Sequence, residues 1–138
     1  MKRKEIRENV FIAAFELTFQ ANTLDEILQY SREYAKMYEV DEFGERIIRL
    51  SVLHAQEIDE KITTKLTGWN VERLPRVCLV ILRLSVAEMM FGDDDMDSIV
   101  INEAVELAKK FSSDDDYQFV NGILGSISRE IHPVAVEG

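Results

Sequence analysis

Hydrophobic residues near the start of the chain recur at the spacing of an α-helix. One stripe consists of apolar residues three or four positions apart, namely Ile6, Val10, Ala13 and Leu17. A second stripe, on the opposite side of the same helix, is aromatic and consists of Phe11, Phe15 and Phe19. The pattern therefore predicts a first helix whose main apolar face is backed by a row of phenylalanines.

Two further helices are predicted in the first half of the chain. The next one runs from about Leu24 to Tyr38, and Asn22 or Thr23 is expected to cap it by accepting hydrogen bonds from the amides of its first turn. A long third helix is expected to begin at Asp41 and to end at Thr67-Gly68. Its apolar face would carry Ile47, Ser51, His54, Ile58, Ile62 and Leu66.

The second half of the chain begins near Trp69 and shows the same helical pattern. Pro75 is tolerated at the start of a helix but not in its middle, so the next helix begins after it. That helix spans 77–91, the most apolar stretch of the chain. Two more helices follow, with inward faces formed by Val100, Ala104, Leu107 and Phe111 and by Val120, Ile123, Leu124, Ile127 and Ile131.

Polar residues mark the ends of these last two helices. Asp97 or Ser98 is expected to cap the first, and the run 112–116 forms the turn and cap before the second. His132-Pro133 ends the last helix and leaves residues 134–138 as a loose tail. We therefore expect one all-α domain over residues 1–138, with an N-terminal half of about 1–67 and a C-terminal half of about 68–133.

Composition and charge narrow the class of protein. The 138 residues are 46% apolar, which suffices for one domain with a buried core. The formal net charge is −10, but residues 1–7 contribute +3, so the remainder carries −13. Because an acidic body repels nucleic acid, any RNA contact would have to use this basic arm. On charge alone, a solubilising tail is the better interpretation of the arm.

Cysteine usage and the length of the apolar stretches indicate a cytoplasmic protein. The single cysteine, Cys78, cannot form an internal disulfide and is expected to be a small buried hydrophobe. The stretch 77–91 is too short to span a bilayer. Acidic residues interrupt the apolar run that a signal peptide would need after Met1. We therefore expect neither export nor a membrane span.

The sequence contains no convincing catalytic or metal-binding pattern. The runs Asp93–Asp95 and Asp114–Asp116 lack the alternating ligands of a calcium loop and are interpreted as caps and solvated turns. His54 and His132 do not have the spacing of metal ligands. There is also no glycine-rich phosphate loop and no nucleophile elbow. The sequence therefore predicts a binding protein without a cofactor, rather than an enzyme.

Two charged residues, Arg83 and Glu88, interrupt the most apolar helix. Buried charges must be paired, and residues five positions apart do not face each other on one helix. Their partners are therefore expected on other helices, with Glu103, Asn102 and Asn121 as candidates. Gly122 lies inside the last helix, where glycine costs roughly 1 kcal/mol relative to alanine. We expect a close helix–helix approach at Gly122 to offset that cost.

Aromatic and basic residues cluster around the turn before the last helix. They are Lys109, Lys110, Phe111, Tyr117 and Phe119. Two interpretations stay open. The phenylalanines can fill the core of the bundle, or exposed rings can stack on unpaired bases while the lysines contact phosphates.

The segments around this turn resemble a known family. Residues 100–111 and 119–124, preceded by Trp69, Arg73-Leu74, Ile81–Leu84 and Glu88, are similar in order and spacing to NusB, the family of bacterial transcription antitermination factors. The N-terminal half is similar more loosely, through the basic arm and Arg7-Glu8. The resemblance implies an all-α fold of about seven helices in two small antiparallel bundles, as helical periodicity also favours.

The resemblance also implies partners. Members of the family bind the single-stranded boxA element of nascent RNA together with NusE, a small-subunit ribosomal protein. The complex joins RNA polymerase and other Nus factors, and it suppresses termination notably on ribosomal RNA operons. By similarity, the chain is therefore expected to be an RNA-binding antitermination factor.

The family's contact residues can be carried over by position. The RNA-binding set comprises the basic arm and the start of the last helix: Lys2, Arg3, Lys4, Arg7, Asp115 and Phe119. Phe15 falls at the junction of RNA and partner protein, where members often carry tyrosine. Cys78 stands where members often carry an acidic residue, so it marks a changed surface for NusE. The alternative to this function is a helical homodimer without RNA binding. The stripe Phe11–Phe15–Phe19 would suit the interface of such a dimer.

Overall fold

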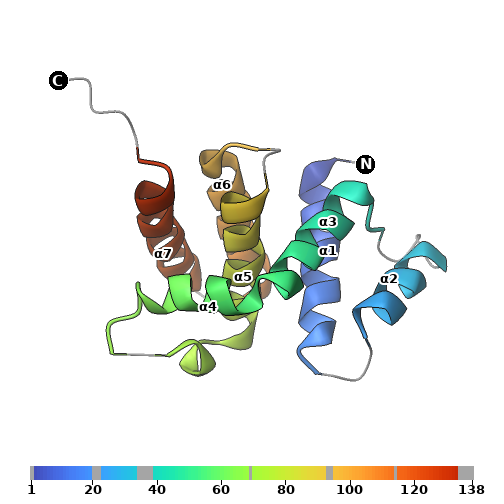
Figure 1. Ribbon diagram of the computed structural model, residues 1–138, viewed down its shortest axis with the longest axis horizontal. Coiled ribbons are helices and arrows are strands. Elements are labelled where there is room, and N and C mark those ends of the chain that lie inside the picture. The colour runs from blue at the N-terminus through green and yellow to red at the C-terminus, as the bar shows by residue number, and fades with distance from the viewer. Residues whose placement is uncertain are drawn as a thin grey trace.

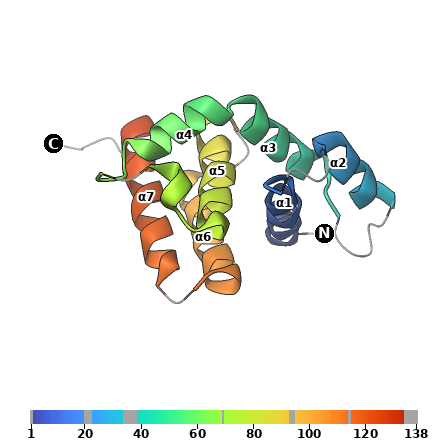
Figure 2. The ribbon, with the colours of Figure 1, turned by 90° about the horizontal axis from the view of Figure 1, so that it is seen from below.

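The computed structural model is all-helical over the residues that it describes, which are 2–19, 23–33, 39–68, 70–92, 95–113 and 115–133. Helices α5, α6 and α7 pack together at one end, α1, α2 and α3 lie at the other, and α4 continues from α3 across α5 and α7 (Figure 1, Figure 2). The all-α class is therefore confirmed. Several expectations fall outside the described residues, namely those for Asn22, Tyr38, Trp69, Asp93, Asp94, Asp114 and 134–138.

The first three helices are α1 (Arg3–Leu17), α2 (Leu24–Glu33) and α3 (Glu42–Leu53). The predicted stripe of α1 is buried at Ile6, Val10 and Ala13 and packs against α3 and α5. Gly44 makes the α1–α3 approach close, because a Cβ there would lie 2.7 Å from Val10 Cγ2 and 2.8 Å from Ile6 Cγ2. Any larger residue at this crossing would force the Ile6 and Val10 side chains, or the helices that carry them, to shift.

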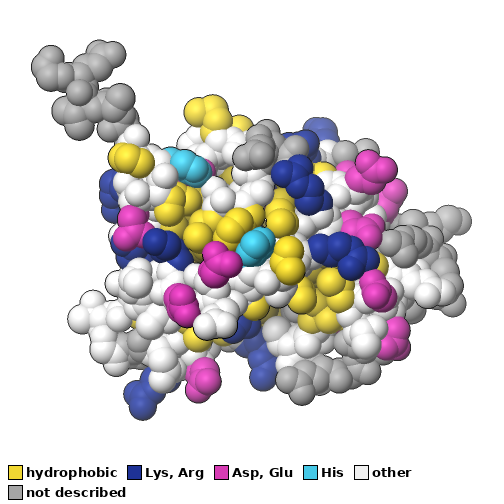
Figure 3. Space-filling view, in the orientation of Figure 1, with side chains coloured by type: hydrophobic (Ala, Val, Ile, Leu, Met, Phe, Trp, Pro, Cys, Tyr) yellow, Lys and Arg dark blue, Asp and Glu magenta, His cyan; other side chains and the backbone are white. Residues whose placement is uncertain are grey.

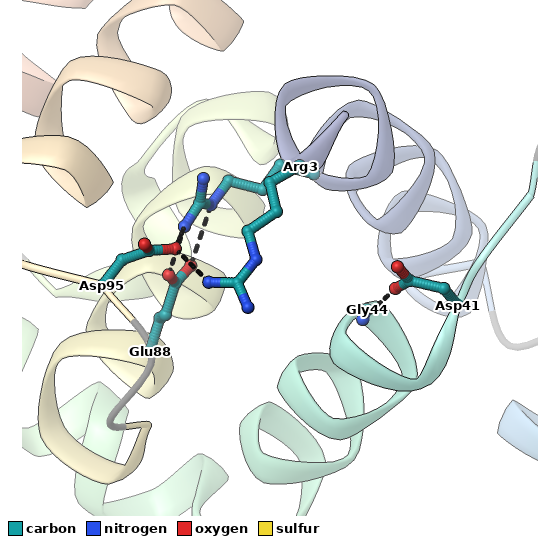
Figure 4. A network of polar contacts seen from close by, with 6 residues as sticks. Arg3, Asp41, Gly44, Glu88 and Asp95 are labelled. Atoms are coloured by element: carbon teal, nitrogen blue, oxygen red, sulfur yellow. Dashed lines mark hydrogen bonds and ion pairs between the residues drawn. The ribbon is translucent and has the colours of Figure 1, made fainter. Parts of the chain in front are cut away.

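Two predicted N-terminal caps are present. The Asp41 carboxylate accepts a hydrogen bond from the Gly44 amide at 2.8 Å at the start of α3 (Figure 4). Thr23 and Glu26 form a reciprocal pair at the start of α2, in which each side chain accepts from the other's backbone amide at 3.2 Å.

The long third helix predicted from the sequence is wrong, because the chain bends at His54 and continues as α4 (Ala55–Thr63). The His54 backbone departs from helical angles, with φ −106° and ψ 24°. Its ring stacks on Phe91 with 3.7 Å between centroids. The bend lets α3 cover α1 and α5 while α4 covers α5 and α7, so both segments bury their isoleucines.

Helix α5 (Arg76–Phe91) is the central element and follows the short 3-10 turn η1 (Val71–Arg73) and Pro75. It packs against α1, α3, α4, α6 and α7, so most of its circumference is buried. Helices α6 (Asp97–Phe111) and α7 (Asp116–Ile131) complete the C-terminal bundle. Among the described helices, none combines the length and the apolar character needed to cross a membrane.

The predicted cap at Asp97 or Ser98 is wrong, because Met96 is the N-cap of α6 and makes no side-chain cap bond. Asp97 lies in the first turn, and its carboxylate instead accepts from the Ser128 hydroxyl and contacts His132 Nδ1, both at 2.7 Å. The Asp97 side chain therefore binds a residue of α7 instead of capping α6, its own helix.

The partners proposed for the charged residues of α5 are also wrong, although both partners do come from other helices. Arg83 donates two hydrogen bonds of 2.8 Å to the Asp59 carboxylate on α4. Its side chain is 34% exposed, so this pair lies at the surface. Glu88 is buried and pairs with Arg7 on α1.

Candidate nucleic-acid interface

The basic arm begins α1 and is exposed at three of its four cations. Lys2, Arg3 and Lys4 are exposed, with Lys2 at the N-cap position and Arg3 as the first residue of the helix. The Arg3 guanidinium lies 4.1 Å from the centroid of the Phe43 ring and donates to Asp95 at 2.7 Å. The arm is therefore held against the body of the protein by α3 and by the segment after α5.

Arg7 differs from the rest of the arm, because its side chain is only 10% exposed. It donates through Nε to one Glu88 oxygen at 3.1 Å and through Nη2 to the other. The same Nη2 donates to Asp95 at 2.7 Å. Figure 4 shows Glu88 and Asp95 beside Arg3 at the N-terminal end of α1. The fork geometry ties α1 to both ends of the α5–α6 connection.

The charges in this network reinforce one another. Burial alone would lower the pKa of Arg7, but hydrogen bonds and charge from Glu88 and Asp95 outweigh it and hold that pKa above its ordinary value. Burial alone would raise the pKa of Asp95, but the hydrogen bonds from Arg3 and Arg7 outweigh it and hold the pKa below its ordinary value. Arg7 is thus committed to an internal ion pair, which disfavours its predicted role as a direct phosphate contact.

The aromatic residues around the turn between α6 and α7 differ in burial. Phe111 packs inward, with its ring centroid 4.9 Å from that of Phe11 on α1. Phe119 faces outward and is 38% exposed, and Asp115 at the N-cap of α7 is exposed without a side-chain cap bond. Lys109 lies 5.0 Å above the centroid of the Tyr117 ring. Core filling therefore explains Phe111, whereas Phe119 is available to a ligand.

The two residues predicted to meet a protein partner differ in access. Phe15 is half-buried and lies between Phe11 and Phe19, with centroids 5.9 Å and 5.3 Å away. Cys78 is fully buried, and its sulfur lies 3.5 Å from the Ser112 hydroxyl. The assignment of Cys78 to a partner surface must be corrected, because no part of the side chain reaches the surface. Its burial also raises the pKa of the thiol.

A charged groove of about 180 Å³ connects the arm to the α6–α7 turn. It runs between α1 and α6 and is lined by Lys4, Glu8, Glu103, Glu106, Leu107 and Lys110. Lys110 pairs with Glu8 across it at 2.5 Å. This link could not be predicted from the sequence, because residues 102 positions apart carry no local signal of contact.

The expectation for Gly122 is wrong. A Cβ built there would meet no atom within 4 Å, and the residue is exposed on α7. No helix approaches it, so helix packing does not explain a glycine at this position. Beside it, an open groove of about 480 Å³ lies between α6 and α7 and is lined by Ser98, Ile101, Asn102, Val105, Tyr117, Gln118 and Asn121.

The chain resembles characterised bacterial proteins along nearly its whole length. The model of the NusB family matches residues 4–129. Transcription antitermination protein NusB of Enterococcus faecalis is 38% identical, with 95% of this chain and 92% of the relative covered. The protein of that name from Agathobacter rectalis is 39% identical, with 93% and 100% covered.

Solved structures agree with this relationship. NusB of T. maritima superposes with a TM-score of 0.82 at 31% identity, covering 94% of this chain and 92% of that one. A chain from the crystal structure of the antitermination factors NusB and NusE in complex with dsRNA superposes with a TM-score of 0.81 at 27% identity, covering 93% and 96%. These matches confirm the predicted family and the prediction that the protein is not an enzyme, and the chain belongs to the NusB family of transcription antitermination proteins.

Proposed function

We propose that this protein binds single-stranded boxA-type RNA together with a NusE-type ribosomal protein. In this proposal the complex joins RNA polymerase and other Nus factors in the cytoplasm and suppresses termination, notably on ribosomal RNA operons. The observation that carries the proposal is the similarity to a structure that holds NusB, NusE and RNA. The arm and the exposed Phe119 supply cations and an aromatic ring, as such a ligand requires.

The contacts divide between two parts of the surface. Lys2, Arg3 and Lys4 meet phosphates, and Phe119 stacks on a base while Asp115 accepts a hydrogen bond from one. Arg7 acts as a positioning residue, since its pair with Glu88 fixes where the arm leaves the body. Phe15 forms part of the junction with the partner protein.

Fluorescence anisotropy with labelled boxA-type RNA tests this proposal, with and without the NusE homologue. We expect weak binding by the protein alone, because the attraction between the basic arm and RNA is opposed by the net charge of −13 on the rest of the chain. We expect markedly tighter binding when the NusE homologue is present. Equal affinity for boxA-type RNA and for a scrambled sequence in the presence of NusE would contradict the proposal.

The homodimer without RNA has lost part of its support. Phe11, one of the three rings on which that alternative rested, is buried and stacked on Phe111. Phe15 is half-buried, so only Phe19 in this stripe is exposed. The stripe mainly completes the core between α1 and α6.

A further inference from the structure

Gly122 occupies a position where the fold gains nothing from a glycine. It lies within α7, well inside the range Asp116–Ile131, where alanine would stabilise the helix more. Its φ is not in the left-handed region, and the space around its Cα is open. Neither backbone conformation nor packing calls for glycine, so Gly122 leaves a bare and open surface that a bound molecule can approach closely.

The neighbouring groove between α6 and α7 has the chemistry of a site for an uncharged planar group. Its volume of about 480 Å³ falls in the ~300–1,000 Å³ range of sites for small organic groups. No charged side chain lines it, so a phosphate would find no cation inside. Its apolar lining comes from Ile101 and Val105, and the Tyr117 side chain also lines it.

The polar groups of this groove are amides with free hydrogen-bonding capacity. Within the described chain, the side chains of Asn102 and Asn121 make no hydrogen bond, and Gln118 contacts only the Tyr117 hydroxyl, at 3.2 Å. A carboxamide both donates and accepts, which matches the edge of a nucleobase. By helix geometry, Gly122 follows Gln118 by four positions and Phe119 by three, so it lies beside each of them on the surface of α7.

We propose that the α6–α7 groove is a nucleobase subsite that takes one unpaired base of single-stranded RNA. The amides of Asn102, Gln118 and Asn121 bind the edge of the base, and bare Gly122 lets the ribose–phosphate chain approach α7 closely. Lys109, above the Tyr117 ring, lies at the rim where a phosphate of the same nucleotide would pass. This subsite rests on the RNA-binding function proposed above.

A protein segment fits this groove less well than RNA does. The exposed apolar side chains nearest the groove, Met96 and Ile99, are 71% and 43% exposed but do not line it, whereas Val52 and Leu53 on α3 are 50% and 75% exposed and line an apolar groove of their own. Figure 3 shows hydrophobic side chains gathered on that face. The α6–α7 groove instead offers amides and an exposed phenylalanine beside them, the groups that bind splayed-out bases.

Gly122→Ala gives a direct test, because it should move stability and binding in opposite directions. We expect a higher melting temperature, since the added methyl group raises helix propensity and meets no atom. We also expect affinity for boxA-type RNA, measured in the presence of the NusE homologue, to fall by about tenfold, the loss of one base contact. The log–log slope of affinity against salt should change by no more than about 0.7, the contribution of the one phosphate that passes Lys109.

Gly125→Ala is the matched control on the same helix. A Cβ there would meet only the end of the flexible Arg129 side chain at 3.3 Å. Gly122 directly follows Asn121, the last residue of α7 that lines the groove, whereas Gly125 lies three residues further along the helix. We expect its RNA affinity to equal that of the wild type. Equal loss of affinity in both variants would overturn the subsite, because it would point to a general effect on α7.

An RNA series with one abasic position at a time identifies the contact as a base. At one position of the RNA, removal of the base should weaken binding to the wild-type protein. The same removal should not weaken binding to Asn121→Ala any further, because that variant has already lost the contact with the base. Independent losses at every position would overturn the subsite while leaving RNA binding itself intact. Unchanged RNA affinity in Gly122→Ala, or a loss of affinity for the NusE homologue measured without RNA, would also overturn it. A wild-type complex that binds no RNA would overturn both the subsite and the proposed function.

Discussion

Removal of Glu88 should destabilise this protein far more than removal of Arg83, which lies in the same helix. In Glu88→Ala, the Arg7 guanidinium stays buried and loses two hydrogen bonds. Breaking a buried ion pair by deleting one partner costs about 3–5 kcal/mol, because the remaining charge is left uncompensated. Arg7 keeps Asp95 at 2.7 Å, so we expect the lower end of that range, about 3 kcal/mol.

The matched control is Arg83→Ala, on the same helix. Its bidentate pair with Asp59 has equally good geometry, but the two side chains are 34% and 27% exposed. Water can therefore solvate the carboxylate that is left behind. Exposed pairs contribute up to about 1 kcal/mol, so the loss in this variant should stay near or below that value.

Urea and thermal unfolding followed by far-UV circular dichroism measure both losses. With an unfolding entropy of about 2.1 cal/mol/K per residue, 1 kcal/mol corresponds to a shift of about 3 °C in a chain of this length. We expect Tm to fall by about 10 °C in Glu88→Ala and by no more than about 3 °C in Arg83→Ala. The sequence alone predicts equal losses, since both residues interrupt one apolar helix.

A double substitution separates the ion pair from simple packing. Arg7→Met with Glu88→Leu removes both charges at once and should recover most of the stability lost in Glu88→Ala, because no unpaired charge remains buried. Equal destabilisation by Glu88→Ala and Arg83→Ala, or a loss below 1 kcal/mol in Glu88→Ala, would refute the reasoning from burial.

Four further outcomes are expected. The pKa of Asp95 is lowered in the folded protein, so the ionised carboxylate stabilises the fold above its unfolded pKa of about 3.9. This stabilisation is lost as the pH falls through the lower folded pKa. In urea midpoints measured against pH, Asp95→Asn should therefore lose less stability than the wild type as the solution is acidified. Gly44→Ala should lower Tm sharply, since its Cβ would lie within 3.0 Å of three side chains, and an unchanged Tm would mean that α1 and α3 separate freely. Phe119→Ala should weaken RNA binding by about 1–3 kcal/mol with little change in Tm, whereas a large fall in Tm with intact binding would make the ring a core residue. The three arm cations should contribute about −2 to the log–log slope of RNA affinity against salt, and charge reversal of Lys2 and Lys4 to glutamate should reduce that contribution to about −0.7, the value for Arg3 alone; an unchanged slope would show that the phosphates bind elsewhere.

Much of the helical architecture could be predicted from the sequence, because its signals are local. The stripe of α1, the start of α5 after Pro75 and the cap at Asp41 depend on residues within a few positions of one another. Helical periodicity and capping chemistry act over that same range. The resemblance that led to the NusB family depends on ordered motifs in the sequence, and it needs no coordinates.

The tertiary structure alone decided which polar groups are paired and which surfaces are free. Arg7 and Glu88 are 81 positions apart, and nothing in the local sequence marks Arg7 as buried or Arg83 as exposed. The same holds for Gly122, whose position inside a helix predicted packing where the fold leaves open space. The physical reason is that burial and ion pairing depend on how helices cross, whereas periodicity fixes only which residues share a face.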